Sequence, residues 1–318
     1  MNPPLIIIGG PTASGKSALA LALAEALESE AGGGTVINAD SMQVYADLAI
    51  LTNRPGEVEA ARVPHRLFGI LDAADPCSAA RWSVLAEAEI AAAEAAGRVP
   101  ILVGGTGLYF RALLQGLAPI PPIPDEIREA ARALHVKLGG EAFREALALL
   151  DPESAAKLPP GDTQRLIRAY EVVAATGRTL GEWHKQGNAG KPKWRVASFV
   201  LLPPRAELYA ACDARMADMV RRGVLEEVGK LVARNLDPSL PVLKAVGLRE
   251  FQLYLEGALP LEAALAAGGQ ATRNYAKRQF TWFRNQMPHA HPLEGQFSES
   301  FLPEIFSFIR QFLLTPTI

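Results

Sequence analysis

The run Gly10-Pro11-Thr12-Ala13-Ser14-Gly15-Lys16-Ser17 constrains the fold of this chain more than any other stretch, because it fits the phosphate-binding pattern G-x-x-x-x-G-K-[ST]. An apolar run at residues 5–8 precedes it and is typical of a buried parallel strand, while the Ala- and Leu-rich residues 17–27 after it predict a helix. Strand, glycine-rich loop and helix together turn backbone N–H groups toward one point at a helix N-terminus, where an anion is favoured. We expect the loop to bind a di- or triphosphate, with Lys16 adding a charge and the Ser17 hydroxyl binding Mg²⁺.

The composition is that of a globular protein. The chain has 318 residues, of which 49% are apolar, and its formal net charge is −2. No apolar run reaches the roughly 18 residues of a membrane span, and Met1-Asn2-Pro3-Pro4 lacks the basic start of a signal peptide. Cys77 and Cys212 lie far apart, and the histidines show no ligand spacing, so neither a disulfide framework nor a zinc site is indicated. We expect a cytoplasmic protein that does not bind a membrane.

The pattern of strands and helices predicts an α/β fold with a parallel sheet around the phosphate-binding loop. Further strands are expected at residues 35–38 and 100–103, followed by Asp40 and Thr106, and a helix is expected between them at residues 79–96. Ligands of open parallel sheets bind beyond the carboxyl ends of the strands. The loop, Asp40 and Thr106 are therefore expected to share one crevice.

A proline-rich run at residues 117–124 predicts a domain boundary, because it forbids regular helix. After it, short helical segments are expected at residues 125–138, 140–150, 152–158 and 163–176. A strand at 196–202 returns the chain to the sheet, and helices follow at 206–222, 225–234, 243–256 and 261–285. The predicted domains are a first part of the core at residues 1–118, a small all-helical insertion at 119–194, and a second, mostly helical part of the core at 195–318.

Positive charge is concentrated in two segments. Residues 164–195 contain seven basic residues against two acidic ones, and residues 270–288 contain four basic residues and no acid. The basic residues are Arg165, Arg168, Arg178, Lys185, Lys191, Lys193 and Arg195 in the first segment, and Arg273, Lys277, Arg278 and Arg284 in the second. Such clusters suit a polyanion, although solvated helix faces are the alternative interpretation of each.

An ordered set of motifs resembles the tRNA dimethylallyltransferase family, in its bacterial type without a zinc finger. The motifs are the phosphate-binding loop, Asp40-Ser41-Met42-Gln43-Val44-Tyr45, Val63-Pro64-His65, Gly104-Gly105-Thr106-Gly107-Leu108-Tyr109, Asp162-Thr163-Gln164-Arg165-Leu166-Ile167-Arg168 and Ala276-Lys277-Arg278-Gln279-Phe280-Thr281-Trp282-Phe283-Arg284. The resemblance extends over residues 5–287. The chain departs from the family at residues 52–55, at Arg66 and at residues 246–250. The resemblance implies transfer of a dimethylallyl group from dimethylallyl diphosphate to N6 of the adenosine 3′ of the anticodon, with release of diphosphate.

The chemistry of that transfer assigns roles to individual residues. An adenine N6 amine is a poor nucleophile that must lose a proton, so a carboxylate is needed beside it. Asp40 is the candidate base, and a helix N-cap is its alternative role. Lys16 is expected to stabilise the leaving diphosphate. By resemblance, Thr106 lies near the reacting base, although it too could cap a helix.

The remaining site assignments also follow the resemblance. The expected diphosphate-binding residues are Gly10, Thr12, Ala13, Ser14, Gly15, Lys16, Ser17 and Arg215. The expected tRNA-binding residues are Asp40, Ser41, Met42, Gln43, Gln164, Arg165, Leu166, Ile167, Arg168, Lys277, Arg278 and Arg284. Mg²⁺ is expected on Ser17, the tRNA anticodon stem-loop is the expected partner, and the protein is expected to be a monomer. Trp282 and Phe283 fit either the core or an RNA-facing surface.

Three other functions share parts of this pattern. A small-molecule kinase would use the same loop and Asp40, but it has no need of two basic segments. An adenylate isopentenyltransferase acting on free AMP would have little use for the helical insertion. A nucleotide-gated RNA-binding module would leave Asp40 and Thr106 without a role. A nucleotide hydrolase is disfavoured because the apolar run before Asp72 is interrupted by Gly69, which predicts a loop after a short strand.

Overall fold

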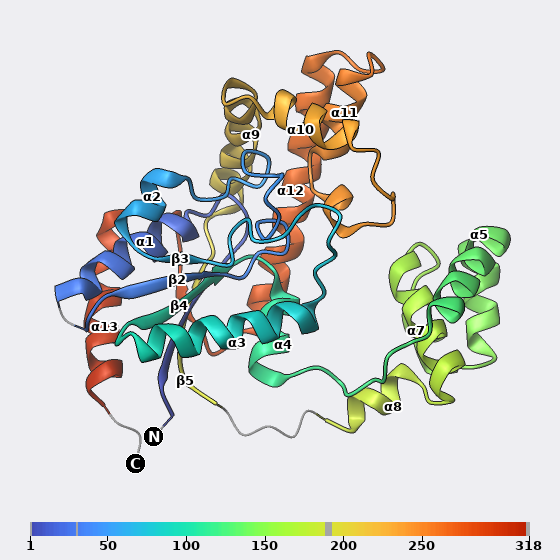
Figure 1. Cartoon of the computed structure of the whole chain (residues 1–318), viewed down its shortest axis with the longest axis horizontal. Coiled ribbons are helices and arrows are strands. Elements are labelled where there is room, and N and C mark those ends of the chain that lie inside the picture. The colour runs from blue at the N-terminus through green and yellow to red at the C-terminus, as the bar shows by residue number, and fades with distance from the viewer. Residues whose placement is uncertain (1, 30, 188–192, 316–318) are drawn as a thin grey trace. The chain divides into compact units, whose positions relative to one another are not determined.

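The computed structural model describes residues 2–29, 31–187 and 193–315. The described residues of Met1–Leu114 and Pro192–Ile318 form one compact unit, here called the core unit, and those of Gln115–Lys191 form a second, the insertion unit (Figure 1). Among these residues, no helix combines the length and the apolar character needed to cross a bilayer.

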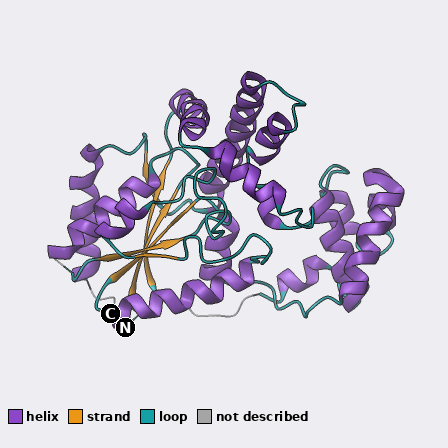
Figure 2. Ribbon diagram, turned by 45° about the horizontal axis from the view of Figure 1, so that its top comes forward, coloured by secondary structure: helices purple, strands orange, loops and turns teal. Residues whose placement is uncertain are grey.

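A parallel sheet of six strands organises the core unit, in the order β3-β2-β4-β1-β5-β6. The strands are β1 (Pro4–Gly9), β2 (Gly34–Asn38), β3 (His65–Arg66), β4 (Val99–Gly104), β5 (Arg195–Leu201) and β6 (His291–Leu293). The central strands are apolar on both faces because helices cover both sides of the sheet (Figure 2). The α/β fold expected from the sequence is confirmed.

Alternate residues of β1 point into two separate hydrophobic cores. Leu5 and Ile7 belong to one core, and Ile6 and Ile8 belong to the other. The helices of the core unit are α1 (Lys16–Ala26), α2 (Glu57–Arg62), α3 (Ala79–Ala95), α4 (Gly107–Gln115), α9 (Arg205–Arg221), α10 (Val224–Ala233), α11 (Leu248–Leu255), α12 (Leu261–Gln286) and α13 (Leu302–Leu314). Helices α1 and α13 pack on one face, while α3, α4 and the group from α9 to α12 contribute to the core on the other.

The carboxyl ends of the strands place the functional segments at one edge of the sheet. The phosphate-binding loop follows β1, Asp40 follows β2, and Thr106 follows β4 and precedes α4. Strand β1 lies between β4 and β5 in the sheet. The loops after β1 and β4 therefore lie beside the segment that follows β5 and leads into α9. The segment before Asp72 is a loop after the short strand β3, as the sequence predicts.

The insertion unit is all helical and has a core of its own. It contains α5 (Asp125–Ala148), α6 (Pro152–Lys157), α7 (Thr163–Thr176) and α8 (Leu180–Lys185). Phe143 and Leu147 of α5 pack with Leu166 and Ala169 of α7. The two helices expected at 125–138 and 140–150 are joined as α5 across a kink at Gly139, whose φ is 74°.

Two parts of the core unit differ from the expected elements. The helix expected at 243–256 is divided into a 3₁₀ turn, Pro241–Lys244, and α11, because Gly247 before α11 has a φ of 91° that a continuous helix does not allow. Strand β6 and helix α13, near the C-terminus, were not expected. Lys191 and the boundary between the insertion and β5 at residues 188–192 lie outside the described residues.

Candidate active site

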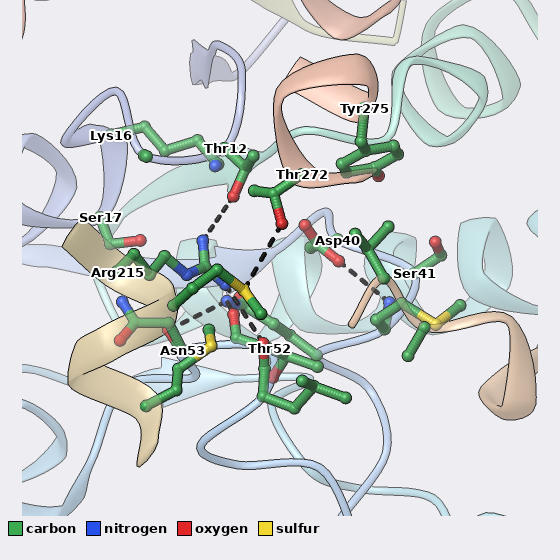
Figure 3. A pocket seen from close by; sticks show the side chains of 18 of the residues that line it. Thr12, Lys16, Ser17, Asp40, Ser41, Thr52, Asn53, Arg215, Thr272 and Tyr275 are labelled. Carbon is green, nitrogen blue, oxygen red and sulfur yellow. Dashed lines mark hydrogen bonds between the residues drawn. The ribbon is translucent and has the colours of Figure 1, made fainter. Parts of the chain in front are cut away.

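A cavity of about 340 Å³ lies at the carboxyl edge of the sheet in the core unit. Its lining residues are Thr12, Ala13, Gly15, Lys16, Ser17, Ala18, Asp40, Ser41, Met42, Gln43, Leu51, Thr52, Asn53, Arg215, Met216, Met219, Lys244, Ala245, Val246, Thr272 and Tyr275. In Figure 3, Lys16, Ser17 and Arg215 gather on one side of the view, and Asp40 and Ser41 lie on the other. The structure therefore brings the phosphate-binding loop, Asp40 and Arg215 to one cavity.

The phosphate-binding loop is held from outside by the segment that precedes α13. The Gln296 side-chain amide donates to the Ala13 carbonyl at 3.1 Å, and the Phe297 N–H donates to the Ser14 carbonyl at 3.1 Å. Ala13 and Gly15 both have positive φ, 62° and 87°. Carbonyl groups fixed outward in this way leave the loop's N–H groups free to turn toward an anion. Gly10 and Ser14, also expected to bind diphosphate, are buried in the loop and do not line the cavity.

Two cationic side chains approach the cavity from separate elements. Burial lowers the pKa of Lys16 to about 8, although the Asp40 carboxylate acts against this shift. Burial also lowers the pKa of Arg215 on α9. The Arg215 guanidinium donates to the Thr12 hydroxyl and, at 3.3 Å, to the Leu51 carbonyl, whereas its Nε has no partner among the described residues. A buried donor without a partner beside a lysine favours an anionic ligand.

Asp40 is positioned by the buried side chain of Asn38, at the end of β2. The Asn38 Oδ1 accepts from the Asp40 N–H at 2.8 Å, and its Nδ2 donates to the Asp40 carbonyl at 3.0 Å. The Asp40 Oδ1 accepts from the Met42 N–H at 3.0 Å, so this carboxylate caps a turn. A regular helix does not begin here among the described residues, which removes the helix N-cap as its alternative role.

Thr106 lies next to the cavity but does not line it. Its hydroxyl accepts from the Ser41 N–H at 2.9 Å, and it also hydrogen-bonds with the Tyr275 phenol, whose pKa is raised by burial. Ser41 and Tyr275 do line the cavity. Thr106 thus joins the turn after β2 to α12, and its position at the start of α4 is compatible with capping that helix as well.

The wall opposite the phosphate-binding loop is a loop held by α10. The Glu227 carboxylate accepts from the Ile50 and Leu51 N–H groups, both at 2.8 Å. The Gln43 side-chain amide donates to the Thr52 carbonyl at 2.9 Å and to the Asn53 carbonyl at 3.2 Å. Gln43 therefore lines the cavity while it braces this wall. Thr52 and Asn53 form part of the wall, and of these two Asn53 departs from the pattern that the sequence resembles.

Part of the cavity is apolar. Met42, Leu51, Met216, Met219 and Val246 line it. The Thr272 hydroxyl contacts the Met216 sulfur at 3.7 Å. A cavity with cationic groups at one part and thioethers at another fits a ligand with a charged head and an apolar tail.

Lys277, Arg278 and Arg284 of α12 are exposed, whereas Arg273 is half-buried and pairs with Asp213. Lys277 and Arg284 line a second cavity of about 220 Å³ together with Arg205 and Tyr209 of α9. Arg278 lies over the Tyr275 ring, with 5.6 Å between the guanidinium carbon and the ring centroid.

Trp282 and Phe283 of α12 face inward to different extents. Phe283 is buried in the core, whereas Trp282 is half-buried and packs against the backbone of Gly107. Their side chains belong with the core in this structure.

The second group of expected tRNA contacts lies on α7 of the insertion unit. Gln164 and Arg165 are exposed, and Ile167 and Arg168 are half-buried. Leu166 was expected to contact tRNA, but its side chain is buried in the core of the unit, which excludes it from a surface contact. The positive charge of the basic segment, residues 164–195, is also partly neutralised by ion pairs. These join Arg165 to Asp162, Arg168 to Glu171, Lys185 to Glu153 and Lys193 to Glu87.

Four residues that contribute to the site were not found from the sequence. Tyr275 and Gln279 lie in or beside the basic motif of α12, where the pattern drew attention to charge and not to these polar side chains. Glu227 and Gln296 act on loops 176 or more residues away in the chain, and no local pattern points to such a contact.

The described residues contain no cluster of three His, Cys, Asp or Glu side chains that could hold a metal ion. The oxygen donors that line the cavity include the Ser17 hydroxyl and the Asp40 carboxylate. Such a donor set suits Mg²⁺ only when phosphate oxygens and water complete its coordination.

Comparison with known proteins identifies the family. The family model described as IPP transferase matches residues 43–286. The chain belongs to the IPP transferase family. A tRNA dimethylallyltransferase of Rhodospirillum centenum is 58% identical over 288 residues, which cover 90% of each chain. That of Paramagnetospirillum magneticum is 50% identical over 314 residues, covering 99% of this chain and 98% of the relative.

Solved structures of this family share the fold. The tRNA isopentenylpyrophosphate transferase of Bacillus halodurans is 32% identical, with a TM-score of 0.71 over 98% of this chain and 97% of the other. A eukaryotic dimethylallyltransferase acting on tRNA has a TM-score of 0.83 and 25% identity, over 99% of this chain and 81% of the other. The resemblance inferred from the motifs is therefore confirmed, and the segment from β6 to α13 lies beyond the residues matched by the family model.

Proposed function

We propose that this IPP transferase transfers a dimethylallyl group from dimethylallyl diphosphate to N6 of the adenosine 3′ of the anticodon in tRNA. The observation that carries the proposal is the lining of the cavity, where Lys16, Arg215 and Lys244 supply three positive charges and Asp40 the single carboxylate, beside an apolar wall. An excess of positive charge in the lining favours a diphosphate, and the apolar wall favours a prenyl tail. Relatives of this chain are named tRNA dimethylallyltransferase, which supports the transfer of a dimethylallyl group to tRNA.

The diphosphate is assigned to the phosphate-binding loop. Thr12, Ala13, Gly15, Lys16 and Ser17 line one part of the cavity, and Arg215 lines it as well and adds its charge beside the same anion. Because negative charge builds up on the diphosphate as its C–O bond breaks, fixed cations lower the barrier to departure. Ser17 would hold Mg²⁺ together with phosphate oxygens and water, and the ion would neutralise part of this charge.

Asp40 is assigned the role of general base. In the transfer, the N6 lone pair forms a bond to C1 of the dimethylallyl group, the C–O bond to diphosphate breaks, and N6 loses a proton to the Asp40 carboxylate. Asn38 fixes the backbone of Asp40, and the Met42 N–H holds its carboxylate, before substrate arrives. Ser41, Thr106 and Tyr275 form a hydrogen-bonded group beside it that positions the adenine.

The tRNA is assigned to the two basic faces. An adenosine must leave its base stack to reach Asp40, and single-stranded loops are read by contacts to splayed bases and phosphates. Lys277, Arg278 and Arg284 on α12 and Gln164, Arg165, Ile167 and Arg168 on α7 are the proposed contacts. The protein is proposed to act in the cytoplasm, as a monomer.

One experiment tests the proposal against its alternatives. The pure protein is incubated with dimethylallyl diphosphate, Mg²⁺ and unmodified tRNA, and the digested nucleosides are analysed by mass spectrometry. We expect adenosine that carries one dimethylallyl group. A prenylated product from free AMP but not from tRNA, phosphoryl transfer from ATP, or RNA binding without any product would each overturn it in favour of one alternative.

A further inference from the structure

The side chain of Gln279 on α12 is buried between two loops of the active site. It is 5% exposed. Its Oε1 accepts from the Thr12 N–H at 2.8 Å, and its Nε2 donates to the Gly105 carbonyl at 2.9 Å. The first loop is the phosphate-binding loop, and the second leads directly into Thr106. One amide therefore links the proposed diphosphate side of the site to the proposed adenine side.

The pairing fixes the orientation of the amide. Thr12 offers a donor and Gly105 offers an acceptor, so only a group with an acceptor on one side and a donor on the other satisfies both. The fit is also tight, because a Cβ at residue 105 would lie 2.1 Å from the Gln279 Nε2. Gly105 thus allows the amide to lie against the backbone of its loop.

The two bonds belong to a longer chain of contacts across the site. From Thr12, the chain continues through its hydroxyl to Arg215, and from Arg215 to the Leu51 carbonyl. From Gly105, it continues through the next residue, Thr106, to the Ser41 N–H. The bond to Gln279 also directs the Thr12 N–H away from the cavity, since Gln279 does not line it.

We infer that Gln279 is a positioning residue, which holds the diphosphate-binding loop and the Thr106 loop in register so that the two substrates meet at Asp40. Where it concerns the adenine that accepts the prenyl group, this inference rests on the proposed function. Where it concerns diphosphate, it rests on the phosphate-binding loop alone and can be measured without tRNA. Gln279 does not line the cavity, so its effect on catalysis is indirect.

The first test replaces the amide by a side chain of similar size with neither donor nor acceptor, Gln279→Met. We expect the Kd of inorganic diphosphate, measured by calorimetry on the isolated protein, to rise about tenfold, and kcat at saturating substrates to fall about 10²-fold, as for a displacement of about 1 Å in reacting groups. The matched control is Gln270→Met, an exposed glutamine on the same helix, which should change neither quantity.

The second test displaces the same amide from the other side. Gly105→Ala places a methyl group where the Gln279 Nε2 lies, and we expect the same two changes. Since both substitutions break one bridge, the double variant should be no worse than either single variant. Independent, additive losses in kcat would overturn the inference, as would wild-type kcat and diphosphate affinity in a folded Gln279→Met protein.

Melting temperatures accompany each measurement. If Gln279→Met does not fold, Gly105→Ala alone carries the test, and wild-type kinetics in that variant overturn the inference. A wild-type protein that binds diphosphate but transfers no prenyl group would contradict the proposed function, and the diphosphate arm would still decide whether Gln279 positions the loop.

Discussion

Asp40 shows how one residue can be placed in a site before its role is known. Asp40 lines the cavity, its backbone is held by the Asn38 amide and its Oδ1 by the Met42 N–H, so Asp40→Asn should preserve the turn while it removes the proton acceptor. We expect kcat to fall about 10²- to 10⁴-fold, the range for a positioned general base, without weaker binding of diphosphate. Steady-state kinetics and calorimetry check the two parts. Asp213→Asn, an exposed carboxylate on α9, is the control, and near-normal turnover of Asp40→Asn would remove Asp40 from the mechanism.

Lys16 predicts a pH dependence for diphosphate binding. Burial lowers its pKa to about 8 in the free protein, and a bound anion raises this pKa because it stabilises the charged form. Lys16 is therefore protonated below this pKa, and affinity should fall as pH rises through it, by up to tenfold per unit. Calorimetric Kd values for inorganic diphosphate on either side of this pKa measure the effect. In Lys16→Arg the charge persists and the decline should disappear; a decline that survives the substitution would assign it to another group.

At the scale of elements, the local patterns predicted most of the core unit. Strands β1, β2, β4 and β5 are apolar runs next to turn residues, and their expected positions agree with the structure within one or two residues. The loops after them could be placed because parallel strands end at one edge. Strand β6 could not, because it has three residues, contains Pro292, and pairs with β5 across about ninety intervening residues. The Gln279 bridge joins residues 267 apart and has no local pattern either.

The segment before α13 carries a prediction at the same scale. Gln296→Ala removes the donor to the Ala13 carbonyl, so the outer side of the phosphate-binding loop loses one of its two anchors. We expect the Kd of diphosphate to rise by about 3- to 10-fold, the effect of roughly 1 kcal/mol for one hydrogen bond, with the KM for tRNA unchanged. Gln286→Ala, at the exposed end of α12, is the control. A larger effect on tRNA than on diphosphate would show that this segment serves the RNA.

At the scale of the whole molecule, charge is arranged on two separate units while the net charge is only −2. The insertion unit has its own hydrophobic core, and its basic residues lie partly in ion pairs on its surface. Burial of Leu166 follows from the 3.6-residue period of α7, which turns this residue inward while Arg165 before it is exposed and Ile167 after it is half-buried. Residues 164–168 were all expected to contact tRNA. On the helix, they divide into a buried stripe and an exposed stripe.

The exposed stripe gives the last prediction. Arg165 and Arg168 lie three residues apart on α7, with 74% and 42% of their side chains exposed, and their carboxylate partners are 3.4 and 3.7 Å away. The exposed pair of Arg165 with Asp162 is worth little, so an RNA phosphate can replace that carboxylate, whereas Glu171, the partner of Arg168, is buried. Each phosphate contact releases counterions, and tRNA affinity should therefore fall steeply with salt.

In the double variant Arg165→Ala, Arg168→Ala, tRNA binding should weaken, and the slope of log K against log salt should flatten by roughly one to two units. Binding of dimethylallyl diphosphate should not change, because its proposed site lies in the core unit. The matched control is Arg62→Ala, Lys230→Ala, which removes two exposed, ion-paired cations from the core unit. Filter binding over a salt series measures both variants. If the first keeps the wild-type affinity and slope, these arginines form a solvated helix face, and the insertion unit does not bind tRNA through α7.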